Sequence, residues 1–205
     1  MFSPRQRAAF EIALVAVPGV LNVATFGVPH AKTVLVLASL VVWLAYAAAR
    51  VRADRGVLRA WGFGWDALRA AATPLVAVTA ALTALALVYG VAVGHVPPPH
   101  GFWVVLALYP IWGVAQQFLL NPILARNFEQ FVPAGAALAA AALGYSLSHA
   151  PDWPMVALTL PAGVLWVWLY RRFPSLWAIG IAHGVIGTCA YYLVLGRDPF
   201  SKLFN

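Results

Sequence analysis

The sequence predicts an all-α fold, a polytopic bundle of transmembrane helices. Hydrophobic residues make up 63% of the 205 residues and charged residues only 9%, and the mean hydropathy is +0.83. Soluble globular chains carry roughly 25% charged residues, so the composition excludes that class. Apolar runs of about 20 residues leave room for about seven spans and no separate soluble domain. We therefore expect a single integral membrane domain over residues 1–205.

Seven apolar runs are the predicted spans. They cover residues 8–26, 33–50, 70–93, 102–126, 132–149, 154–170 and 176–195. Between the second and third runs, residues 50–69 carry five arginines interleaved with Trp61, Phe63 and Trp65. Because aromatic and basic side chains together suit the headgroup region, we expect an amphipathic segment along the membrane surface there. The alanine-rich stretch PAGAALAAAALG in the fifth run predicts a close approach by a neighbouring helix.

The basic residues predict how the helices are oriented. With the N-terminus inside, ten of the 13 Lys and Arg residues fall on the inner side. The three on the outer side are Lys32, Arg197 and Lys202. This bias predicts an inner N-terminus and an outer C-terminus. Since orientation accounts for the formal charge of +7, we expect the lipid bilayer and no nucleic acid as a partner, in the cytoplasmic membrane of a prokaryote.

Polar side chains inside the apolar runs are the functional candidates, because such groups are costly in hydrocarbon. They are Glu11, Asn22, Gln116, Gln117, Asn121, Tyr145, His149, His183 and Thr188. Most lie in the last four runs, where two adjacent glutamines precede histidines on two later helices. A purely structural interpretation is that the amides make interhelical hydrogen bonds, worth about 0.6 kcal/mol each.

Three short stretches in the C-terminal half resemble the motifs of a known family. QQFLLN, YSLSH and HGVIG follow one another in the order and span placement of the EExxxR, FxxxH and HxxxN motifs of the CPBP family, the CAAX-protease and bacteriocin-processing or Abi-like intramembrane endopeptidases. The resemblance covers about residues 102–195, and residues 1–101 form the N-terminal spans and the amphipathic linker. It implies catalytic positions at Gln116, Gln117, His149 and His183, and substrate-binding positions at Asn121, Tyr145 and Thr188.

The departures from the motifs predict a change of function. Gln116 and Gln117 stand where the family has glutamates, Asn121 where it has arginine, and Gly187 where it has asparagine. An amide has no basic pKa near neutrality, and losing a general base typically removes about 10²–10⁴-fold in rate. We therefore expect a non-proteolytic binding or accessory membrane protein. A lipid, a membrane peptide or a partner transmembrane helix is the expected ligand.

Two alternatives remain open at this point. One is an active endopeptidase that cleaves prenylated or membrane-embedded peptides with a rearranged base, supplied by Asp152 or by one of the two histidines. The other is a subunit in which His149 and His183 ligate haem, a pigment or a metal. Our main expectation is that the protein has no cofactor. For His149 to reach Gln116 and His183, the fifth helix must tilt or end within the membrane.

Overall fold

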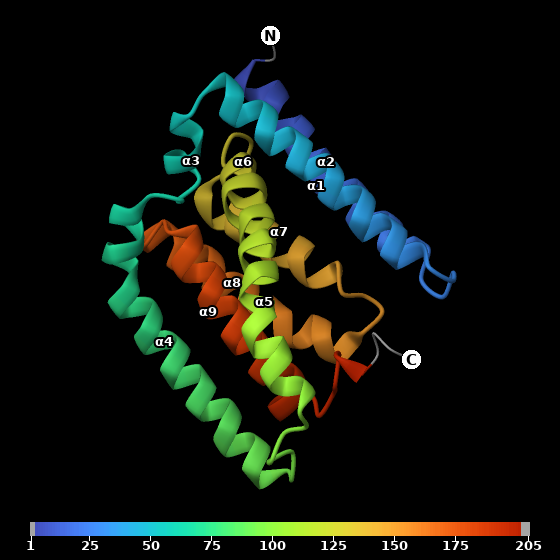
Figure 1. Cartoon of the computed structure of the whole chain (residues 1–205). Helices are drawn as coiled ribbons and strands as arrows, with labels where there is room; N and C mark the ends of the chain where they lie inside the picture. Colours follow the sequence, from blue (N-terminus) through green and yellow to red (C-terminus); the bar gives the residue numbers. More distant parts are fainter. Residues whose placement is uncertain (1–2, 202–205) are drawn as a thin grey trace. The chain divides into compact units, whose positions relative to one another are not determined.

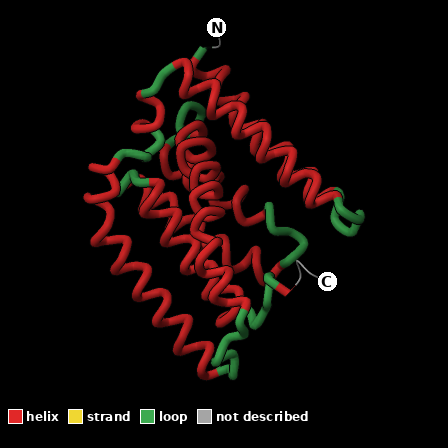
Figure 2. The backbone as a smooth tube through the Cα atoms, in the orientation of Figure 1, coloured by secondary structure: helices red, strands yellow, loops and turns green. Residues whose placement is uncertain are grey.

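A computed structural model describes residues 3–201, and its elements are helices joined by short loops (Figure 2). Lys202, one of the predicted outer basic residues, lies outside these residues. No strand occurs within residues 3–201. Six helical stretches are long and apolar enough to cross a membrane. This confirms the prediction of an all-α polytopic bundle.

The chain divides into two compact units, each made of two separate stretches of sequence. The first unit contains the residues up to Trp61 together with Phe118–Arg172, and the second contains Gly62–Gln117 together with the residues from Phe173 onward. That residues 1–205 form a single domain stays a prediction, because the division into two compact units does not show whether either unit folds alone.

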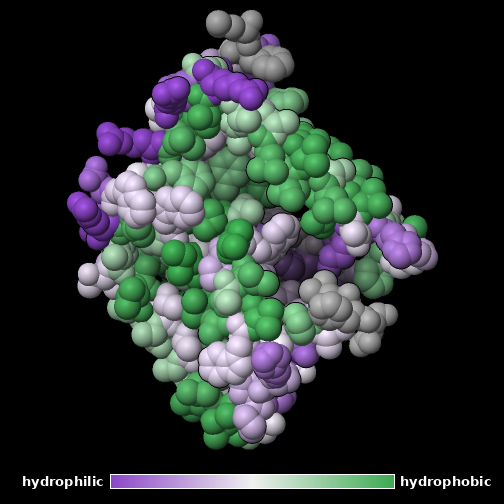
Figure 3. All heavy atoms as spheres, viewed as in Figure 1, coloured by the Kyte–Doolittle hydropathy of each residue, from purple (hydrophilic) through white to green (hydrophobic). Residues whose placement is uncertain are grey.

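The first unit begins with an antiparallel pair of long helices, α1 (Pro4–Ala24) and α2 (Ala31–Ala53) (Figure 1). The start of α1 is fixed by a capping box in which Ser3 and Gln6 bond each other's backbone N–H, with Pro4 as the first helical residue. The short helix α3 (Gly56–Ala60) follows α2. Many side chains on α1 and α2 are exposed and apolar, as Figure 3 shows for the visible face of this pair. These faces are suited to lipid.

Residues 50–69 are predicted to form one segment along the membrane surface, and in the structure they belong to three elements. They comprise the end of α2, helix α3 and the start of α4 (Trp65–Ala92). Trp65 is 73% exposed, as expected at an interface, whereas Trp61 is buried against Phe118 at 5.0 Å between ring centroids. Tyr170 also donates a hydrogen bond to the Trp61 carbonyl. Tertiary packing thus draws one of the three aromatic residues inward.

The remaining helices of the first unit are η1 (Leu119–Ala125), α6 (Arg126–Phe128), α7 (Ala134–Leu147) and α8 (Trp153–Arg172). η1 is a π-helical segment around Pro122, and such widened turns accommodate a ring that lacks an N–H. Small residues pack α7 against α8, as predicted: a Cβ on Gly163 would lie 3.1 Å from the Cα of Ala142. At 14 residues, α7 is about 21 Å long, shorter than the roughly 30 Å hydrocarbon core. That this helix, the fifth predicted span, ends within the membrane stays a prediction.

The second unit consists of α4, α5 (Gly101–Phe118, whose last residue belongs to the first unit), α9 (Leu176–Cys189) and the π-helical segment η2 (Ala190–Val194). Ser175 caps the start of α9 by accepting the Ala178 N–H. Helix α4 lies along α9, and α5, which overlaps α9 in the view of Figure 1, contacts α9 through the glycines described next. Their packing creates the part of the candidate site described next.

Candidate functional site

Glycines bring helices α5 and α9 into backbone contact. A Cβ on Gly113 would lie 2.3 Å from the Gly180 carbonyl oxygen, and one on Gly184 would lie 2.4 Å from the Cα of Pro110. Only hydrogen atoms at these positions permit the observed spacing, because ordinary carbon–carbon contacts are about 3.5–4.0 Å. Small residues at a helix interface are typical of membrane proteins. Side chains next to these glycines are consequently held close to the facing helix.

Gln117 and His183 form a buried hydrogen bond across this contact. The Gln117 amide nitrogen donates to His183 Nδ1 at 2.6 Å, and the two residues are 0% and 4% exposed. Because Nδ1 then uses its lone pair as an acceptor, the neutral imidazole carries its proton on Nε2. The structure thus brings together two of the four predicted catalytic positions as an uncharged pair.

The ring of Tyr109 packs beside this pair. It meets His183 edge to face at 6.1 Å between ring centroids. A Cβ on Gly187, one turn along α9 from His183, would lie 2.5 Å from Tyr109 Cε1. The ring therefore fills the space beside residue 187. Tyr109 was not among the sequence candidates, although its spacing of four residues from Gly113, and eight from Gln117, places it on the same helix face.

Gln116 has a different environment from its neighbour. Its side-chain oxygen Oε1 is buried and, among the described residues, has no hydrogen-bond partner. Buried acceptors in native proteins almost always have a partner, so this atom calls for a donor from water or a ligand. Thr188, a predicted substrate-binding residue, is fully buried and donates to the Gly184 carbonyl of its own helix at 2.8 Å. Its hydroxyl proton is therefore used within α9.

The first unit contains the other three predicted site residues. Asn121 lies in η1 and is 1% exposed. Tyr145 and His149 meet edge to face at 5.3 Å between ring centroids. His149 Nδ1–H donates to the Tyr145 carbonyl at 3.0 Å, which leaves the lone pair on Nε2. That His149 shares one cavity with Gln116 and His183 stays a prediction.

His149 lies in the turn after α7, outside the membrane-spanning helices. Burial lowers the pKa of its imidazole below the ordinary 6.5, more than hydrogen bonds to backbone carbonyls raise it. The neutral ring is thereby favoured, as a general base or a hydrogen-bond acceptor requires. The Asn22 amide of α1 donates to the Ser148 carbonyl at 3.3 Å and so contacts this turn from the N-terminal part of the chain.

Glu11 is placed in a cluster that the sequence did not foresee. Its carboxylate accepts hydrogen bonds from Tyr46, from Arg50 at 3.1 Å and from the Asn127 amide at 2.5 Å. Asn127 belongs to α6, which directly continues the helix of the first motif. Glu11 therefore does adjoin the end of that helix, where it is held by an ion pair. A signal was available in α2, because Tyr46 and Arg50 are four residues apart and share a face.

Asp152, considered above as a replacement base, and Glu129 both have structural roles. Asp152 Oδ1 accepts the Met155 N–H at 3.3 Å and caps α8. Glu129 pairs with Arg171 at 2.6 Å in an exposed position. Over residues 3–201, no three His, Cys, Asp or Glu side chains gather closely enough to hold a metal ion. Ligation of haem, a pigment or a metal by His149 and His183 stays a prediction.

The fold is that of a polytopic helical membrane protein. Its candidate site contains a buried, hydrogen-bonded pair of an amide and an imidazole, between helices that contact each other through glycines. Residues 97–189 match the family model described as type II CAAX prenyl endopeptidase Rce1-like. This region is therefore similar to that family, which confirms the resemblance drawn from the three motifs. Neither a curated protein nor a solved structure matches the chain.

Proposed function

We propose that this protein binds a membrane-embedded peptide without cleaving it, using Gln116 together with the Gln117–His183 pair. The observation that carries the proposal concerns Gln116, the residue next to Gln117, because the buried Oε1 of Gln116 has no hydrogen-bond partner among the described residues. This atom needs a donor, which a peptide N–H provides, whereas lipid esters and phosphodiesters offer mainly acceptors. A prenylated C-terminal peptide is the natural class of ligand, since the family is described by its action on CAAX prenyl proteins.

The residues at the motif positions support binding rather than hydrolysis. Neither glutamine side chain can take a proton from water, and His183 Nδ1 already accepts a hydrogen bond. At residue 187, where the third motif has asparagine, the adjoining space is filled by Tyr109. A side chain at residue 187 that donates a hydrogen bond to an oxyanion would fit only if the Tyr109 ring moved. Gln116, Gln117 and His183 are therefore suited to hold a peptide, and they lack the general base that ordinarily activates water.

Location and orientation belong to the same proposal. The exposed arginines gather at one end of α1 and α2, which suits insertion into the cytoplasmic membrane of a prokaryote with the N-terminus inside. A partner transmembrane helix is a second form that the peptide ligand could take. Both forms present backbone or side-chain N–H groups at membrane depth.

The test is binding of a fluorescent farnesylated peptide to the full chain in detergent micelles, measured by polarisation. Gln116→Leu keeps the side-chain volume and removes the acceptor, so affinity should fall about two- to tenfold, the worth of one hydrogen bond of about 0.5–1.5 kcal/mol. Gln130→Leu is the matched control, because Gln130 is exposed in the turn after α6. Equal affinity in all three proteins would refute a role for Gln116.

One observation favours proteolysis as a second candidate function. His149 keeps a lone pair on Nε2, and its lowered pKa keeps the ring neutral, as a group that is to accept a proton must be. Mass spectrometry of the same farnesylated peptide separates the two functions. A shortened peptide that disappears with His149→Ala would establish cleavage, and an intact peptide in all samples is the result expected for binding alone.

A further inference from the structure

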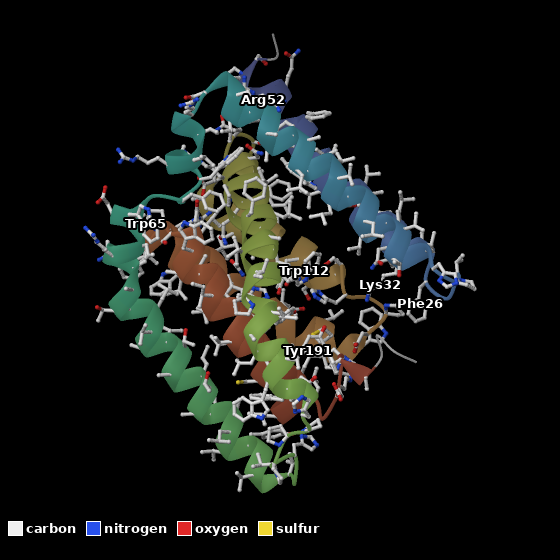
Figure 4. The ribbon with its side chains drawn as sticks, viewed as in Figure 1. Phe26, Lys32, Arg52, Trp65, Trp112 and Tyr191 are labelled. Carbon is white, nitrogen blue, oxygen red and sulfur yellow. The ribbon has the colours of Figure 1, made fainter. Side chains whose placement is uncertain are left out.

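Exposed arginines gather at one end of the first unit, which we call the basic end. It comprises Arg5, Arg7, Arg52, Arg55 and Arg59, all of them exposed. They come from the start of α1, the end of α2 and the adjoining α3, which meet because α1 and α2 are antiparallel. Figure 4 shows Arg52 at this end of α2, with Phe26 and Lys32 at the opposite end of the pair.

Four of the five arginines of the basic end form no ion pair among the described residues. Within residues 3–201, no carboxylate pairs with Arg5, Arg7, Arg52 or Arg55. Asp54 is the one acidic residue in this stretch, and its Oδ1 accepts the Gly56 N–H at 2.8 Å. Glu11, one helical turn further along α1, is already held by Arg50. Several guanidinium groups are therefore available to an anion from outside the chain.

Apolar side chains beside the arginines indicate where in the membrane the basic end lies. Phe10 follows Arg7 by three residues and is 44% exposed, and Leu58 lies between Arg55 and Arg59 and is 39% exposed. Figure 3 shows hydrophilic atoms at this end bordering the apolar face of the helices. Alternating cationic and apolar exposure is suited to the boundary between headgroups and hydrocarbon. A nucleic acid or an acidic soluble protein would leave Phe10 and Leu58 without apolar contact.

We propose that the basic end binds the phosphate-bearing headgroups of anionic phospholipids and so selects them over zwitterionic ones. Each guanidinium can make a bidentate pair with phosphate oxygens. Each arginine close to an anionic lipid surface enriches such lipids by about fivefold at moderate ionic strength. The basic end shares no residue with the proposed peptide site, and this proposal does not depend on the proposed function.

The experiment measures which lipids the full chain retains from micelles that contain phosphatidylglycerol and phosphatidylcholine of the same chain length in equal amounts. Native mass spectrometry gives the ratio of the two bound lipids. Arg52→Gln should lower that ratio about fivefold and the pair Arg52→Gln with Arg55→Gln tenfold or more. Lys32→Gln is the matched control, because it removes one positive charge from the opposite end of α2 and should change the ratio less than twofold.

Three results would overturn the proposal. Equal retention of the two lipids by the unmodified protein would show that no selection exists. A loss in Lys32→Gln equal to that in Arg52→Gln would assign the effect to net charge rather than to the basic end. Complete displacement of phosphatidylglycerol by about 100 mM inorganic phosphate, beyond the effect of sodium chloride at equal ionic strength, would identify a free phosphate ion as the ligand. Unfolding temperatures that agree among the variants ensure that only intact protein is compared.

Discussion

Gly184→Ala is the sharpest test of the glycine contact that holds Gln117 against His183. The new methyl group would lie 2.4 Å from both N and Cα of Pro110. These are backbone atoms, so α5 and α9 must separate by about 1 Å or more to restore ordinary contact. Overpacking of this kind costs about 1–3 kcal/mol. Separation also weakens the 2.6 Å hydrogen bond between buried partners, which adds about 1–2 kcal/mol.

Gly144→Ala is the control for that substitution. A Cβ on Gly144, in the exposed face of α7, would meet nothing within 4 Å. Both variants gain the same helix propensity, so Gly184→Ala should be less stable than Gly144→Ala by about 2–5 kcal/mol. The measurement is unfolding by SDS in mixed micelles, followed by tryptophan fluorescence. Equal midpoints for the two variants would refute the backbone contact between α5 and α9 and, with it, the geometry of the site.

Two further predictions concern charged groups of the first unit. Glu11→Gln leaves the largely buried Arg50 without its counter-ion and should cost about 1–3 kcal/mol of unfolding free energy, whereas Glu129→Gln, which breaks an exposed pair, should cost less than about 1 kcal/mol. The reverse order in SDS unfolding would contradict the assignment. Because burial lowers the pKa of His149, the unfolded chain takes up a proton first on acidification, so stability should fall between about pH 7.5 and pH 5.5. His149→Gln should show a smaller fall over the same range, and an equal fall would show that His149 is not the group responsible.

Much of the architecture was predictable because it depends on local composition. Apolar runs long enough to cross hydrocarbon determine where helices lie, and the observed bounds agree with the expected ranges to within five residues. A π-helical segment surrounds Pro122, because a proline inside a helix lacks the N–H of the regular hydrogen-bond pattern. The small residues of α7 predicted close packing, which Gly163 of α8 provides. In each case a few neighbouring residues contain the information.

The candidate site was only partly predictable. The sequence identified Gln117 and His183 as polar groups in apolar helices, and the motif spacing related them. It did not distinguish Gln116 from Gln117, which point about 100° apart on a helix. Nor did it identify Tyr109, because a tyrosine in an apolar run ordinarily packs without further role. Which group faces which partner depends on the register of two helices, and glycine contacts fix that register.

By itself the sequence determined that this is a polytopic helical membrane protein, that its polar residues concentrate in the C-terminal helices and that its arginines favour one side. Those properties follow from free energies of transfer, which are summed along the chain. Only the tertiary structure decided that Gln117 donates to His183, that Tyr109 fills the space beside Gly187 and that Glu11 joins Asn127. These contacts join residues far apart in sequence, and their formation depends on how closely the backbones approach.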